Sequence, residues 1–181
     1  HAMLLRYYDG ISLAEVKSAC KAAFAEQQAH MDRIGNEGKR MLREAYAADM
    51  PVIILASRPY HADPEVCHGI DKLICDLGAA VITEDSVADE IPRFEVNVLN
   101  QWTYHSRMYA AARYVAENAR EHPKLNLVQF VSFGCGVDAI TTDEIRSILE
   151  SAGKIYTQIK IDEITNLGTV KIRLRSLFAT M

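Results

Sequence analysis

The sequence predicts an α/β protein built on a doubly wound, mostly parallel four-stranded sheet of the Rossmann-like type. Three short apolar runs, 51–57, 79–83 and 125–133, have the composition of strands buried on both faces. Each run is followed, directly or after a loop, by a stretch whose apolar residues recur at helical spacing. This alternation is typical of a parallel sheet covered by helices on both sides.

A fourth run, 155–161, alternates polar and apolar residues, which favours an edge strand with one wetter face. Right-handed crossovers then favour the strand order 2-1-3-4, counted along the sequence. In that order the topological switch point lies between the first and third strands. We therefore expect the loops at 58–61 and 134–136 to face each other across a crevice.

Helix signals separate the strands. Asp63, Pro64 and Glu65 supply an N-cap, a proline at the first helical position and an acid in the first turn. Thr141 and Glu144 have the spacing of a capping box, so we expect the third crossover helix to begin there. The helices predicted between and after the strands span 63–77, about 102–121, 142–152 and 167–178.

The amino-terminal part of the chain is predicted to be a separate helical segment. Residues 1–3 look like residues left by an expression vector. Residues 4–49 are predicted to form the helical segment and residues 50–181 the α/β domain, which suggests a domain taken from a longer protein. Ser12 and Glu15 form another capping-box spacing. Gly35 to Gly38 predicts a break between two helices, the second ending before Met50. Cys20 falls on an apolar stripe and is expected to be a small core residue.

Composition excludes several classes of protein. The chain has 181 residues, a net charge of -4 and 49% hydrophobic residues, enough for one globular domain with a real core. No window approaches the roughly 20 apolar residues of a membrane span. The absence of a basic run argues against nucleic acid as a partner. The four cysteines form no C-x-x-C pair, so we expect a reduced, cytoplasmic protein without a self-contained zinc or ferredoxin-type site.

The candidate site is centred on Cys135, which lies between Gly134 and Gly136 where a buried strand ends. Glycine on both sides permits positive φ and the close approach of a ligand. Arg58, Tyr60 and His61 lie on the opposite loop, so a Cys135–His61 pair of nucleophile and base is one interpretation. The simpler interpretation is a tight strand-to-helix turn with an inert thiol.

Further residues flank this crevice in the predicted fold. Glu84 and Asp85 follow the second strand, and Asp162 and Glu163 follow the fourth. The connection 86–100 lacks periodicity, which favours a lid or binding loop.

Two histidines look structural, and Cys20 and Cys75 are expected to play no chemical role. His68 and His105 look like ordinary helix residues, although His68 is able to reach the crevice mouth. Cys67 and Cys75 would lie about 12 Å apart along one helix, too far to share a metal ion, with Cys75 facing away from the sheet.

The turn also matches the dinucleotide fingerprint G-x-G-x-x-A over 134–139. Two observations weaken this interpretation: the turn is the third of the domain rather than the first, and the helix is expected to begin beyond the pattern. Nucleotide or phosphate binding is therefore kept as a minor alternative.

Four stretches taken together resemble one family. They are Arg58-Pro-Tyr-His61-x-Asp-Pro-Glu-x-x-His68-Gly69-Ile70, Gln101-Trp-x-Tyr-His-Ser-Arg107, Ser132-Phe-Gly-Cys135-Gly136 with Asp138-Ala139, and Lys160-Ile-Asp162-Glu163-x-x-Asn166-Leu-Gly168. The chain resembles, over roughly 51–180, the large acyl-CoA dehydratase activase-related proteins. These CoA-substrate-specific enzyme activases are related to 2-hydroxyacyl-CoA dehydratase subunits.

The resemblance implies a role in anaerobic metabolism around an iron–sulfur cluster. Such long proteins combine ATP-dependent activase modules with a dehydratase-like region whose cluster is held by cysteines from more than one domain. Cys135 matches the family's cysteine position, with Gly134 and Gly136 beside it, and Arg58, Tyr60 and His61 would line the same crevice near a CoA thioester. Cys67 takes no ligand role from the resemblance.

The leading hypothesis is therefore a dehydratase-like domain in which Cys135 is one ligand of a cluster shared with other domains of the parent chain. The alternatives are a non-catalytic domain that binds a ligand or partner, and a thiol-dependent enzyme using Cys135 and His61. The chain alone is expected to fold without a stable cluster and without ATP hydrolysis, because it offers one crevice thiol and no G-x-x-x-x-G-K-[ST] loop.

Overall fold

The computed structural model describes residues 1–132, 134–162 and 166–181. The chain forms two compact units, residues 1–34 and residues 35–181. In chain order the elements of the described residues are η1 (Leu4–Arg6), α1 (Leu13–Ala47), β1 (Val52–Ala56), η2 (Pro59–Ala62), α2 (Pro64–Cys67), α3 (Ile70–Asp76), β2 (Ala80–Thr83), η3 (Glu84–Ser86), η4 (Ala88–Glu90), α4 (Thr103–Glu117), β3 (Leu125–Val131), α5 (Gly136–Ser151), β4 (Thr157–Lys160) and α6 (Gly168–Phe178).

In the first unit, the capping box that we predicted forms at the start of α1. The Ser12 amide donates to the Glu15 carboxylate at 2.8 Å, and the Glu15 amide donates to the Ser12 hydroxyl at 3.1 Å. The expectation that Cys20 is a core residue is wrong: Cys20 is exposed, as is the apolar Phe24 one helical turn further along. Residues 1–34 contain only η1 besides this helix, so the unit has no second layer to bury an apolar face.

The predicted break at Gly35–Gly38 is also wrong, because α1 continues through it to Ala47. Gly38 does not end the helix but allows it to pack closely against η3. A Cβ atom at this position would lie 2.4 Å from the Cβ of Ser86 in η3. The absence of a side chain lets the helix approach that turn closely. Beyond this point Leu42 and Ala45 are buried, so the end of α1 belongs to the core of the second unit.

The second unit contains the predicted sheet. Its described strands are all parallel and run in the order β2-β1-β3-β4, which confirms the predicted fold class and topology. Val52 of β1 lies opposite Ala80 of β2 and Leu125 of β3, and Val128 of β3 lies opposite Thr157 of β4. The third strand is shorter than predicted and ends at Val131; Phe133 lies outside the described residues.

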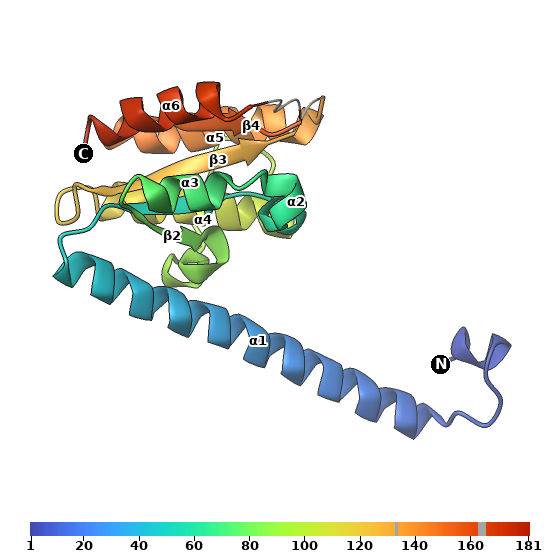
Figure 1. Cartoon of the computed structure of the whole chain (residues 1–181). Helices are drawn as coiled ribbons and strands as arrows, with labels where there is room; N and C mark the ends of the chain where they lie inside the picture. Colours follow the sequence, from blue (N-terminus) through green and yellow to red (C-terminus); the bar gives the residue numbers. More distant parts are fainter. Residues whose placement is uncertain (133, 163–165) are drawn as a thin grey trace. The chain divides into compact units, whose positions relative to one another are not determined.

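Alternate residues of β1 face two apolar cores, one on each side of the sheet. Val52, Ile54 and Ala56 pack with α4, α5 and the end of α1. Ile53 and Leu55 pack on the other side with α3 and α6 (Figure 1). This double coverage explains why the strand sequence is apolar throughout instead of alternating.

The helix predicted over 63–77 is interrupted. Asp63 caps its start as predicted, since its carboxylate accepts from the Glu65 amide at 2.9 Å. His68 and Gly69 then adopt left-handed backbone conformations, with φ of 53° and 72°, and separate α2 from α3. The 12 Å separation that we expected between Cys67 and Cys75 assumed one continuous helix and no longer follows. Cys67 is buried in the core, whereas Cys75 is exposed as predicted.

The remaining helices keep their predicted positions with shifted ends. The helix expected at about 102–121 spans Thr103–Glu117, and Met108, Ala111, Ala112 and Val115 are buried on it. Val170, Leu174 and Leu177 of α6 are buried. Among the described residues, no helix combines the length and the apolar character needed to cross a membrane.

Candidate functional site

The two predicted loops meet where β1 and β3 end. These strands are parallel neighbours, with Ala56 opposite Gln129. Arg58 follows β1 and Ser132 follows β3, so both residues lie at the carboxyl edge of the sheet. This is the switch point of the 2-1-3-4 order, where open α/β sheets bind ligands.

Helix α5 begins at Gly136 and not near Thr141, so the predicted helix start is wrong. Cys135 is the N-cap residue, and Gly134 before it has a φ of 63°, which favours glycine. The capping box expected at Thr141 and Glu144 does not form. The Thr141 hydroxyl instead donates to the Val137 carbonyl at 2.8 Å, and the Glu144 carboxylate accepts from the Asn97 amide at 3.1 Å.

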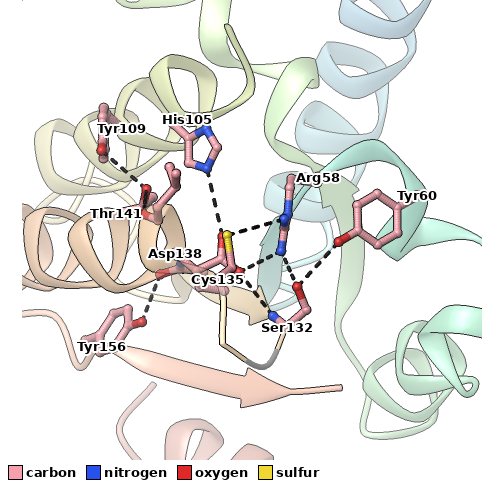
Figure 2. A network of polar contacts seen from close by, with 11 residues as sticks. Arg58, Tyr60, His105, Tyr109, Ser132, Cys135, Asp138, Thr141 and Tyr156 are labelled. Atoms are coloured by element: carbon pink, nitrogen blue, oxygen red, sulfur yellow. Dashed lines mark hydrogen bonds and ion pairs between the residues drawn. The ribbon is translucent and has the colours of Figure 1, made fainter. Parts of the chain in front are cut away.

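Asp138, in the first turn of α5, joins both loops. Its Oδ2 accepts from Arg58 Nη2 at 2.6 Å and from the Ser132 backbone amide at 3.1 Å. The pair is largely shielded from solvent, with exposed side-chain fractions of 18% for Arg58 and 6% for Asp138. Arg58 also donates to the Ser132 hydroxyl (Figure 2). The predicted meeting of the two loops is confirmed by these contacts.

The Cys135 thiol lies against Arg58. Arg58 Nη1 donates to Cys135 Sγ at 3.7 Å, and Cys135 as a residue is partly exposed. Tyr60, from the same loop as Arg58, places its ring 5.2 Å from the guanidinium carbon and its hydroxyl 3.4 Å from the Ser132 hydroxyl. Figure 2 shows Arg58, Ser132, Asp138 and Cys135 pointing toward one another.

His105 is a site residue that the sequence did not reveal. It lies in the first turn of α4, it is buried, and its Nε2 is 3.9 Å from Asp138 Oδ1. Burial lowers the pKa of His105, and the negative charge of Asp138 opposes that shift. Only its place in the Gln101–Arg107 motif distinguished it, because helical periodicity cannot show that α4 and α5 pack side by side.

His61 is close to this network without bonding to the thiol. It has no exposed surface, and its ring meets the Tyr60 ring edge-on with centroids 4.3 Å apart. Burial, and then the positive charge of Arg58, lower the pKa of His61 to about 4, so the imidazole is neutral at pH 7. Within the described residues neither nitrogen of His61 has a hydrogen-bond partner. The structure therefore places Arg58, not His61, against Cys135.

The predicted flanking acids occupy different environments. Glu84 is only 3% exposed, and burial, followed by the charge of Asp85, raises its pKa to about 8. The Asp85 carboxylate accepts from the Thr83 hydroxyl at 2.6 Å. Asp162 is half-buried after β4, and Glu163 lies outside the described residues.

His68 and the dinucleotide interpretation both need revision. His68 is exposed in the turn between α2 and α3 and is not part of a helix. The early start of α5 places the helix within the G-x-G-x-x-A pattern, which removes one objection to nucleotide binding. However, the Asp138 carboxylate fills the first turn, where a phosphate would meet negative charge.

The donor set fits one ligand of a metal cluster and not a complete site. Among the described residues no group of three or more His, Cys, Asp or Glu side chains could hold a metal ion. An iron–sulfur cluster is usually held by about four thiolates. Of the four cysteines, only Cys135 has a place in the crevice network; Cys20 and Cys75 are exposed on helices and Cys67 is in the core.

Within the part of the chain that the structure describes, the contacts of Cys135 do not include the base that the Cys135–His61 interpretation requires. The partner of Cys135 among the described residues is the Arg58 guanidinium, which does not accept a proton, so no general base lies beside the thiol there.

Comparison with known proteins gives one match. Residues 1–87 match the family model described as CoA enzyme activase uncharacterised domain (DUF2229). The match supports a CoA-enzyme activase-related family for this chain, and it includes the loop that carries Arg58, Tyr60 and His61. No curated protein and no solved structure was found to match the sequence.

Proposed function

We propose that this chain is a dehydratase-like domain of a CoA-enzyme activase-related protein, in which Cys135 supplies one ligand to a shared iron–sulfur cluster. The other ligands would come from other domains of the parent chain. The observation that carries the proposal is the placement of Cys135: a partly exposed sulfur at the carboxyl edge of the sheet, between two glycines, with Arg58 donating to it at 3.7 Å. The family match to residues 1–87 supports the activase-related context.

Arg58 has a defined task in this proposal. Hydrogen bonds to the sulfur atoms of a cluster tune its reduction potential, and groups outside the ligand shell orient the ligands. Asp138 fixes the guanidinium through a 2.6 Å contact, and the Ser132 amide fixes Asp138 at 3.1 Å. The cluster itself would supply one-electron transfer, as expected for a site acting on CoA thioesters. In this chain Arg58 and Asp138 hold Cys135 ready for ligation.

The proposal is tested by counting iron and acid-labile sulfide in the full-length parent after anaerobic reconstitution. We expect Cys135→Ser to lower both, and the matched control Cys75→Ser, on an exposed helix position, to leave both unchanged. Unchanged iron and sulfide in Cys135→Ser would refute the ligand role. The isolated chain, reconstituted in parallel, is expected to be colourless and to hydrolyse no ATP.

A second candidate is a domain that binds a polar ligand in the same crevice. It is favoured by buried nitrogen atoms that have no hydrogen-bond partner among the described residues: both ring nitrogens of His61, both of His105, and Nε of Arg58. Buried polar groups are normally satisfied, so a ligand or water is expected to bond to them. NMR titration with a CoA thioester separates the candidates, because a pure binding domain would respond to it equally well in Cys135→Ser.

A further inference from the structure

A second concave site, separate from the crevice, lies beside the first turns of α4. It is a hollow of about 530 Å³ between the segment 88–101 and α4, which we call the α4 hollow. Its size falls within the roughly 300–1,000 Å³ of small-molecule sites. None of Arg58, Cys135 and Asp138 lines it, so it is distinct from the crevice. Its walls include Ile91, Arg93, Phe94, Gln101, Ser106 and Arg107.

The walls of the α4 hollow are held in place by contacts with the domain. Phe94, Val96 and Val98 pack against the core that contains α4 and α5. Between them, the Asn97 amide donates to the buried Glu144 carboxylate at 3.1 Å. The Ser106 hydroxyl of α4 donates to the Asn100 side chain. The segment therefore forms a preformed wall, although no regular element spans 91–102.

The α4 hollow is lined by two arginines from different elements. Arg93 comes from the irregular segment and has no ion pair among the described residues, and Arg107 comes from α4. Asp89 is the one carboxylate among the lining residues. The neighbouring Glu90 is already paired with Lys39 at 2.5 Å. The lining thus carries a net positive charge, and guanidinium groups match phosphate oxygens in geometry.

The amino-terminal end of α4 adds to this field. Thr103, the first residue of this 15-residue helix, lines the hollow. The helix has no side-chain cap on its N-cap residue Trp102 and no acid in its first turn. Free amides and the helix dipole favour an anion there. The irregular segment also brings Ile91, Pro92 and Phe94 into the lining, and these apolar side chains suit an organic group attached to that anion.

We infer that the α4 hollow binds a small phosphate ester, with the phosphate against Arg93, Arg107 and the start of α4, and the organic group against Phe94. This site is independent of the cluster proposal and uses none of its residues. It gives a role to the irregular connection at 86–100 and to the Gln101–Arg107 motif. Within the crevice network described above, His105 is the residue that comes from this motif.

The test is isothermal titration calorimetry of the full chain with ADP, adenosine, inorganic phosphate and succinate as probes. We expect ADP to bind, inorganic phosphate to compete with it, and adenosine and succinate to bind at least about tenfold more weakly. Arg93→Gln and Arg107→Gln should each weaken ADP binding about tenfold or more, the scale of one lost charge-assisted contact. Arg120→Gln, an exposed arginine beyond the end of α4, is the matched control and should bind normally.

Several outcomes would overturn the inference. Absence of ADP binding at millimolar concentration, or equal binding of adenosine or succinate, would exclude a phosphate-ester site. ADP binding that is unchanged in both arginine variants would place the ligand elsewhere. Arg107 is partly buried, so its variant is interpreted only if its unfolding midpoint matches that of the parent chain. The exposed Arg93, which has no ion pair among the described residues, keeps the test decisive if Arg107→Gln does not fold.

Discussion

Replacement of Asp138 by asparagine tests whether the contacts of the crevice are coupled. The substitution keeps the size of the side chain and removes the charge that faces Arg58 at 2.6 Å. Breaking a buried ion pair on one side typically costs about 3–5 kcal/mol. Arg58 keeps 18% of its side chain exposed and keeps its bond to Ser132, so we place the loss in unfolding free energy somewhat below that range, at about 2–3 kcal/mol.

A double-mutant cycle separates the pair from its surroundings. Arg58→Met alone should cost a similar amount, because it leaves Asp138 charged and 6% exposed. The double variant should cost about 2 kcal/mol less than the sum of the single variants, since neither charge is then left alone. Urea unfolding at pH 7, followed by circular dichroism and by the fluorescence of the single tryptophan, Trp102, measures all four proteins.

The matched control lies on the same helix. Asp143 pairs with Arg146 at 3.3 Å, but both side chains are exposed, so Asp143→Asn should change stability by less than about 0.5 kcal/mol. Additive losses in the cycle, or equal effects of Asp138→Asn and Asp143→Asn, would refute the reasoning that Asp138 holds Arg58 in place through a shielded charge pair.

Two further predictions concern other buried positions. Glu84 has a folded-state pKa of about 8 against an ordinary value of 4.5, so the stability of the folded chain should fall as pH rises between these values. Relative to the parent chain, Glu84→Gln should therefore become more stable by about 3 kcal/mol between pH 5 and pH 8. A difference in urea unfolding free energy that does not change with pH would contradict this. Gly38→Ala should cost about 1–3 kcal/mol through overlap with Ser86, and the additional change Ser86→Gly should restore part of it. Gly35→Ala on the same helix, where an added Cβ meets no described atom within 4 Å, should not destabilise the chain.

The topology was predictable because it depends on composition and on general rules. Strands buried on both faces need unbroken apolar runs, and right-handed crossovers restrict the strand order. The Asp63 cap and the Ser12–Glu15 box were also predictable, since each is completed within a few residues of sequence.

Features that depend on distant partners were missed. Thr141 and Glu144 have capping-box spacing, yet Glu144 bonds to Asn97 instead, a partner 47 residues away in sequence. Gly38 looked like a helix break because the sequence does not show that Ser86 packs against it. Tertiary packing decided both positions.

The site was predicted in its location and not in its contacts. The switch-point rule correctly predicted that the loop carrying Arg58 lies close to the turn carrying Cys135. It did not indicate that Arg58, rather than His61, would lie against the thiol, or that His105 would approach Asp138. Those contacts depend on how the side chains pack once α4 and α5 are in place, which strand order does not specify.

The central claim, that Cys135 ligates a shared cluster, is tested most directly by cysteine footprinting of the full-length parent. The protein is alkylated under anaerobic conditions before and after cluster assembly, and mass spectrometry reads each cysteine separately. We predict that Cys135 is alkylated before assembly and protected afterwards, whereas the exposed Cys20 and Cys75 react in both states. A protein that carries its full complement of iron and sulfide while Cys135 still reacts as before would contradict the account.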